Sequence, residues 1–220
     1  MGWASATSAR CSNLTAVVYY LPSCIVTFDI ASGEATHQYS YLLTTGTGVS
    51  EILALNNHEF LVDERDGHGR ANGDDAVVKQ LFKIDLRNAV DISSMDATTA
   101  LPNAVSKTLF LDIVQALIAN GFTAGNIPAK IEGISFGPDV SVGKSKVHTL
   151  WVANDNDFLE TVPDASGNDL PNDNQFFVFG FHRRGSRRVR LCPATSEVAV
   201  LEFAPEARGK AALIYECGLD

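Results

Sequence analysis

The sequence predicts an all-β fold, a partial or open β-propeller of four-stranded antiparallel blades into which one amphipathic helix is inserted. Short segments rich in β-branched and aromatic residues recur between turn signals, as in chains made of strands. A hairpin led by a glutamate occurs twice, and the two glutamates are 81 positions apart. That spacing matches two propeller blades of roughly 40 to 45 residues each. On the same period a chain of 220 residues supplies about four or five blades.

The first strand candidates precede the repeated hairpin. Residues 16–28 read AVVYYLPSCIVTF, which predicts two short strands separated by Pro22 and Ser23. A turn is expected at residues 30–33, and residues 36–43 form the next strand candidate. The Gly-rich run TTGTG closes this strand.

The repeated hairpin is the main internal signal. In its first copy, residues 50–67, two apolar runs flank the polar turn Asn56-Asn57-His58 and the second run ends in charged residues. Residues 77–86 then predict a further strand. The second copy starts with KIEGISFGPD at residue 130 and continues in HTLWVANDNDF. Glu51 and Glu132 occupy equivalent positions in the first strand of each copy.

One stretch departs from the strand pattern. Residues 106–122 carry apolar side chains at helical spacing, with Ser106 placed to cap the start of a helix and Gly121 to end it. This segment is expected to be an amphipathic helix that covers an edge of the β structure and has no cofactor role. Its buried face is predicted to consist of Leu109, Ile113, Val114 and Leu117.

Composition and charge exclude some classes of protein and suggest a domain boundary. A net charge of −9 argues against nucleic-acid binding, which needs clustered Lys and Arg. The apolar stretch at residues 16–30 is interrupted by polar residues, so it predicts neither a membrane span nor a signal-peptide core. Bases outnumber acids from His182 onward, which divides the chain into residues 1–181 and an extension, residues 182–220. The arginines of that extension are expected to form a solvated tail.

The cysteines lack the spacing of a metal or redox motif. The chain has four of them, and none forms a CxxC pair, which argues against a zinc knuckle and a thioredoxin-like motif. Buried free thiols are the expected state, although an oxidising compartment would permit a bridge. The four are Cys11, Cys24, Cys192 and Cys217.

Two groups of oxygen-bearing side chains are candidate metal ligands. Glu51 and Glu132 start strands that would line a propeller channel, where carboxylates from successive blades could converge on Ca²⁺. The alternative is that each caps a turn or pairs with Arg65 or Lys130. The second group follows the strand of the second hairpin copy and lacks the Gly and distal Glu of an EF-hand loop. The alternative to a metal site there is an Asx-rich turn, whose side chains bond to their own backbone. The members of this second group are Asn154, Asp155, Asn156 and Asp157.

A candidate catalytic group follows the first hairpin. Glu64, Arg65, Asp66 and His68 place acids, a fixed cation and an imidazole within five residues. The arginine could hold a phosphate while an acid accepts a proton. The alternative is a surface salt-bridge cluster. The run GISFG at residues 133–137 has the letters of GxSxG, but it lies in a predicted hairpin strand and not at the strand-to-helix turn of a nucleophile elbow. HExxH, P-loop and dinucleotide fingerprints do not occur. Ester hydrolysis is therefore expected to use metal-activated water rather than a serine triad.

The segments GVSEILALNNHEFLVDERDGHG, VKQLFKIDL, KIEGISFGPD, HTLWVANDNDF and NQFFVFGF together resemble the esterase-like activity of phytase family, over roughly residues 16–181. The resemblance implies a β-propeller that is usually exported, to the periplasm or the cell exterior, and is related in fold to calcium-using phytases that hydrolyse phosphoesters. Members are longer, with further blades before the point where this chain begins, and residues 182–220 match nothing in the family.

Two functions therefore stand open. One is a calcium-assisted hydrolase of phosphoesters or carboxylic esters, and the other is a non-catalytic propeller that binds a small ligand or a protein on its channel face. Because four or so blades cannot close a ring of six, the sheet edges are expected to stay open or to be covered by self-association.

Overall fold

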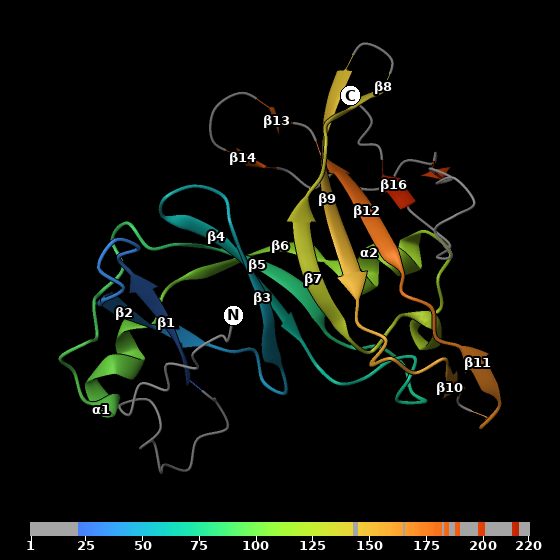
Figure 1. Cartoon of the computed structure of the whole chain (residues 1–220), viewed down its shortest axis with the longest axis horizontal. Helices are drawn as coiled ribbons and strands as arrows, with labels where there is room; N and C mark the ends of the chain where they lie inside the picture. The colour runs from blue at the N-terminus through green and yellow to red at the C-terminus, as the bar shows by residue number, and fades with distance from the viewer. Residues whose placement is uncertain are drawn as a thin grey trace. The chain divides into compact units, whose positions relative to one another are not determined.

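The computed structural model describes residues 22–142, 145–164 and 166–181, and beyond them the backbone of four short strands (Figure 1). Strands predominate over helices throughout this part of the chain, so the predicted all-β class is confirmed. Two compact units divide the chain. Unit 1 comprises Met1–Gly46, Ala54–Phe60 and Ile84–Thr108, and unit 2 comprises Thr47–Leu53, Leu61–Lys83 and Leu109–Asp220.

Unit 1 contains an antiparallel hairpin of β1 (Pro22–Phe28) and β2 (Ala35–Leu42). Its turn is closed by the Asp29 carboxylate, which accepts a hydrogen bond of 2.7 Å from the Ser32 amide. The short helices α1 (Ala97–Ala100) and η1 (Leu101–Asn103) also belong to this unit. The strand predicted before Pro22 lies outside the described residues. Apolar side chains buried in unit 1 include Tyr39, Tyr41, Leu43, Ile84, Leu86, Ile92, Ala100 and Val105.

A four-stranded sheet follows the chain in sequence order, as the strands of a propeller blade do. Its strands are β3 (Gly48–Ala54), β4 (Glu59–Arg65), β5 (Lys79–Asp85) and β6 (Lys107–Asp112). The first two form the predicted hairpin around residues 56–58, where the Asn56 side chain accepts hydrogen bonds from the amides of His58 and Glu59. The first hairpin copy is thus confirmed.

The second hairpin copy belongs to another sheet, in unit 2. Strand β9 (Ser145–Asn154) pairs antiparallel with β7 (Ile131–Phe136) on one side and β12 (Phe176–Phe181) on the other. Figure 1 shows these three strands side by side. The remaining strands are β8 (Val140–Val142), β10 (Thr161–Pro163), β11 (Asp169–Pro171), β13 (Arg183–Arg184), β14 (Arg188–Val189), β15 (Val198–Val200) and β16 (Leu213–Tyr215).

The predicted helix is shorter than expected and begins later. Helix α2 spans Ile113–Ala119, and the first half of the predicted segment is strand β6. Asp112, not Ser106, caps the helix by accepting a hydrogen bond of 2.9 Å from the Gln115 amide. Gly121 has a positive φ of 89° just beyond the last turn, which confirms it as the point where the helix ends.

The apolar face of that helix is buried as predicted, with one exception. Ile113, Val114 and Leu117 are buried, whereas Leu109 lies in β6 and is 48% exposed. The 3-10 helix η2 (Ala124–Asn126) follows. Much of the core of unit 2 comes from strand residues such as Leu61, Leu81, Phe110, Ile131, Ile134, Val147, Leu150, Val152, Phe177, Val178 and Phe179.

The expectation of free thiols is wrong at the one cysteine among the described residues. Cys24 is disulfide-bonded. Cys11, Cys192, Cys217 and the boundary at His182 lie outside the described residues, so those expectations stay predictions. Of the arginines in the predicted tail, Arg183, Arg184 and Arg188 lie in the paired strands β13 and β14. No helix in the described part of the chain is long and apolar enough to cross a membrane.

Candidate functional site

The carboxylate of Asp63 is buried without a hydrogen-bond partner. Asp63 is 0% exposed, and neither of its side-chain oxygens receives a hydrogen bond. Burial raises its pKa to about 7, against the lowering effect of Arg65 and Lys79. The charges of Glu51 and Glu132 raise it further. Asp63 therefore takes up and releases a proton near neutral pH, which is the behaviour expected of a residue at a functional site.

Strand β4 explains why this carboxylate is buried. Side chains alternate along a strand, so Leu61, Asp63 and Arg65 project to one face and Val62 and Glu64 to the other. Residues 61–64 are all buried, so both faces of the strand are covered. On the second face the Glu64 carboxylate, also 0% exposed, accepts a hydrogen bond of 3.2 Å from the Thr47 hydroxyl.

Arg65 joins the two copies of the hairpin. Its Nη2 donates to Glu132 Oε1 in an ion pair, and its Nη1 donates to the Asp66 carbonyl at 3.3 Å. Its Nε is buried and has no partner. The predicted pairing of Glu132 with Arg65 is therefore present. The Glu51 carboxylate accepts a hydrogen bond of 3.3 Å from the Ile52 amide.

The two glutamates predicted as metal ligands are thus both close enough to Asp63 to perturb its titration. The sequence analysis singled out Glu51 and Glu132 but not Asp63 itself. The repeat pointed to the two glutamates because they occupy equivalent positions in it. Nothing in the residue pattern showed that the side chain of Asp63 is buried.

Asp66 and Lys79 form a second buried group. The Lys79 ammonium is 0% exposed, and it donates to Asp66 Oδ1 in an ion pair and to the His68 carbonyl at 2.9 Å. The other carboxylate oxygen of Asp66 accepts the Val78 amide at 2.8 Å. Burial lowers the pKa of Lys79, and the Asp66 carboxylate opposes that effect. This pair satisfies its own charges and fixes the loop between β4 and β5.

His68 lies at the surface beside an aspartate. Its Nδ1 is 2.6 Å from Asp74 Oδ2, and this hydrogen bond raises the pKa of the imidazole. Asp74 also accepts the Gly69 amide at 2.7 Å, which lowers the pKa of its carboxyl. Of the four predicted catalytic residues, Arg65 is the one whose charge lowers the pKa of Asp63. Roles for Glu64, Arg65, Asp66 and His68 in chemistry stay predictions.

The oxygen-rich segment after β9 forms turns. Asp155 accepts the Asp157 amide at 2.9 Å, and Asn156 accepts the Phe158 amide at 3.1 Å. Asp157 is ion-paired with Lys130, whose Nζ is 2.6 Å from Asp157 Oδ1. Asn154 is buried and accepts the Gln175 amide at 2.6 Å. This is the geometry of the Asx-rich alternative, and these side-chain oxygens already bind groups of the chain.

No three His, Cys, Asp or Glu side chains within the described ranges form a group that could by itself hold a metal ion. Asp63 contributes two oxygens without a hydrogen-bond partner, and the charges of Glu51 and Glu132 act on it. The chemistry of these carboxylates suits hard cations, which take oxygen ligands. Water and a substrate would have to supply the remaining ligands.

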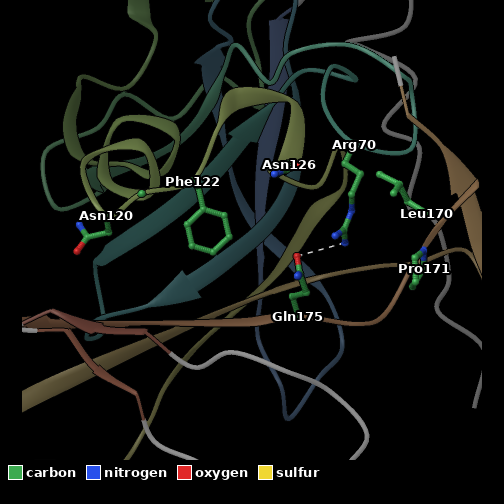
Figure 2. Close-up of a pocket in the computed structure, with 8 residues that line it drawn as sticks. Arg70, Asn120, Phe122, Asn126, Leu170, Pro171 and Gln175 are labelled. Atoms are coloured by element: carbon green, nitrogen blue, oxygen red, sulfur yellow. Dashed lines mark hydrogen bonds between the residues drawn. The ribbon is translucent and has the colours of Figure 1, made fainter. Parts of the chain in front are cut away.

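A pocket of about 420 Å³ in unit 2 involves none of these residues. Figure 2 shows the guanidinium of Arg70 directed toward Gln175, with the ring of Phe122 on one side and Leu170 and Pro171 on the other. Asn120, Gly121 and Asn126 complete its lining. This pocket could not be predicted from the sequence, because Arg70 lies in a polar loop and the residues that line the pocket with it come from distant segments.

Comparison with known families gives one result. The model of the phytase-like family, described as esterase-like activity of phytase, matches residues 16–158. This range includes both hairpin copies and every residue of the Asp63 region. No curated protein and no solved structure matches the chain significantly.

Proposed function

Since the chain belongs to the phytase-like family, described as esterase-like activity of phytase, we propose that it is a metal-assisted hydrolase of phosphoesters or carboxylic esters, with Asp63 at its centre. The observation that carries this proposal is the unpartnered carboxylate of Asp63, which is fully buried beside two further acids. A buried charge without a partner is costly, so such groups persist where they bind a cation or exchange a proton.

The orphaned oxygens of Asp63 fit a divalent cation such as Ca²⁺. Asp63 and Glu51 would hold it, and Glu132 would join them if its ion pair with Arg65 opened. When bound, the cation would supply Lewis-acid polarisation of the ester oxygen. Asn154, Asp155 and Asp157 remain a second proposed ligand group, which would have to release its turn hydrogen bonds to bind metal.

Arg65 and Asp63 supply the remaining chemistry from the chain itself. A guanidinium binds two oxygens of a phosphate or carboxylate at once, and the side chain of Arg65, which is 20% exposed, would do so if its Nη contacts to Glu132 and Asp66 opened. In the absence of a cation, Asp63 is half protonated at about pH 7, so it can accept a proton from water there. Glu132 holds Arg65 in place in the meantime.

The disulfide bond of Cys24 supports an exported location. Disulfides persist in oxidising compartments, such as the periplasm and the cell exterior. Such compartments also hold more free Ca²⁺ than the cytosol does. The proposed location therefore agrees with the proposed cation.

The test is hydrolysis of phytate, p-nitrophenyl phosphate and p-nitrophenyl acetate, each measured with Ca²⁺ and with EDTA. We expect turnover only with Ca²⁺, and its loss in Asp63→Asn. Asp169→Asn is the matched control, because Asp169 is exposed in β11 and belongs to none of the groups described above. Its turnover should equal that of the wild type.

A folded preparation without metal-dependent turnover would overturn the hydrolase proposal. Ca²⁺ binding by that same preparation, lost in Asp63→Asn, would then favour the second function, a non-catalytic propeller that binds ligands. Light scattering on the same sample measures whether the sheet edges stay open or are covered by self-association, the two outcomes expected from the sequence.

A further inference from the structure

Arg70 is a cation without a carboxylate partner. Its Nη2 donates to the neutral amide oxygen of Gln175 at 3.2 Å, and its Nε is buried without any partner. None of the ion pairs in the described part of the chain includes it. Burial lowers the pKa of its guanidinium, and the charge of Asp173 opposes that effect only from a distance. Arginines removed from water are normally paired with anions.

The backbone holds Arg70 firmly in its place. Its amide donates to the Ile127 carbonyl at 2.8 Å, and its own carbonyl accepts the Ala129 amide at 2.9 Å. The preceding residue, Gly69, has a φ of 130°, and a Cβ there would come within 2.6 Å of the Ile127 carbonyl oxygen. Only glycine fits at this close approach. The cation is therefore preorganised, which lowers the entropic cost of binding a ligand.

The rest of the pocket combines apolar walls with amide groups. Phe122, Leu170 and Pro171 supply the walls, and the Phe122 ring is braced by an edge-on contact with Phe177 at 5.7 Å between centroids. Asn120 and Asn126 add polar groups to the lining. In Figure 2 the guanidinium lies between the aromatic wall and the Leu170 and Pro171 wall. A pocket with apolar walls, few polar groups and a volume of about 420 Å³ suits a small molecule.

We propose that this pocket binds a small organic anion whose carboxylate or phosphate group pairs with Arg70 and whose flat apolar body lies between Phe122 and Pro171. The anion would supply the charge partner that the chain does not provide. The inference does not depend on the proposed hydrolase, because it concerns other residues and its readout is binding rather than turnover.

Isothermal titration calorimetry tests the proposal with three probes, in EDTA so that no cation contributes. The probes are phenyl phosphate, benzoate and inorganic phosphate. We expect binding of phenyl phosphate or benzoate, and at least about tenfold weaker binding of inorganic phosphate, which lacks the apolar body. The comparison of the first two probes distinguishes a phosphate ligand from a carboxylate ligand.

Two variants connect binding to Arg70. Arg70→Met keeps the length of the side chain but removes its charge, and should weaken binding about tenfold or more. Arg87→Met is the matched control, since Arg87 is an exposed arginine in unit 1 that pairs with Asp85. Binding by this control should not change.

Gln175→Glu gives a result that a misfolded variant could not imitate. It places a carboxylate where the amide oxygen of Gln175 meets Arg70, so it should raise the melting temperature and abolish anion binding at the same time. Absence of binding by the wild type to both phenyl phosphate and benzoate would overturn the proposal. Unchanged affinity in folded Arg70→Met or Gln175→Glu would also overturn it.

Discussion

The two copies of the glutamate-led hairpin carry similar residues and differ in what surrounds them. The first, β3 and β4, ends in Asp63 and Asp66, which are 0% and 7% exposed. The second, β7 and β9, ends in Asp155 and Asp157, which are exposed and bind turn amides or a surface lysine. The same kind of acidic cluster is therefore withdrawn from water in one copy and solvated in the other.

The difference shows that burial, not residue type, makes a carboxylate useful. In water a carboxylate satisfies its oxygens with solvent and has an ordinary affinity for protons and cations. In β4 and directly after it, the buried group either takes an internal partner, as Asp66 does with Lys79, or stays unsatisfied, as Asp63 does. Only the unsatisfied group has free energy to gain from binding something else.

The largest expected effect comes from breaking the internal pair of the first hairpin. Lys79→Met leaves the Asp66 carboxylate buried without its charge partner, and should lower the free energy of unfolding by about 3 to 5 kcal/mol. Lys130→Met removes the exposed partner of Asp157, after the second hairpin. This substitution should change the free energy of unfolding by less than about 1 kcal/mol. Urea unfolding at pH 7 measures both.

The double variant Lys79→Met with Asp66→Asn serves as the control, because it removes both charges and should recover part of the lost stability. Equal effects of the two lysine substitutions would contradict the contrast between the hairpins.

The next effect is a pH dependence specific to Asp63. Because its pKa is raised in the folded state, Asp63 stabilises the protein fully below about pH 4, where it is protonated in both states. That stability is lost as the pH rises to about 7, and the loss corresponds to roughly 4 kcal/mol. Asp63→Asn stays neutral, so it should be more stable than the wild type at pH 8 in EDTA.

Unfolding of both proteins in urea between pH 4 and pH 8 measures the difference between them, and other titrating groups cancel in that difference. If the free energies of unfolding of the wild type and of Asp63→Asn followed parallel curves against pH, Asp63 would not be a buried charge without compensation. Excess Ca²⁺ should remove much of the advantage of the variant, since a ligand that binds only the folded state stabilises it.

The smallest effect belongs to the loop after β9. Asp157→Asn keeps a residue type that tolerates the positive φ of 53° at this position and removes only the surface ion pair with Lys130. We expect a change of less than about 1 kcal/mol and an unchanged response to Ca²⁺ in thermal melts. A reduced response would show that this loop binds the cation, as one of the two sequence-based interpretations of the loop holds.

Local patterns predicted the strands and the turn of the first hairpin, since strand alternation and turn residues act over a few positions. The helix shows the limit of such patterns. Ser106 and Asp112 are both acceptable caps, and residues 107–112 fit either structure. Pairing in the sheet decided in favour of a strand, a tertiary effect that overrides local propensity.

The candidate site was predictable only in part. The repeat identified Glu51 and Glu132, but the burial of Asp63 depends on what covers both faces of β4, and no local pattern reports that. Arg70 is held by backbone bonds to Ile127 and Ala129, which are more than fifty residues away in the sequence. Contacts of that range are set by the fold as a whole.

The titration of Asp63 tests the account most directly. Carbon-13 NMR of the aspartate carboxyl carbons, with Asp63 assigned by comparison with Asp63→Asn, gives its pKa in EDTA and in Ca²⁺. The account predicts a pKa of about 7 in EDTA, because the buried charge is unpaired, and a lower value in Ca²⁺, because a cation favours the ionised form. A pKa near the ordinary value of 3.8 in EDTA, unmoved by Ca²⁺, would contradict it.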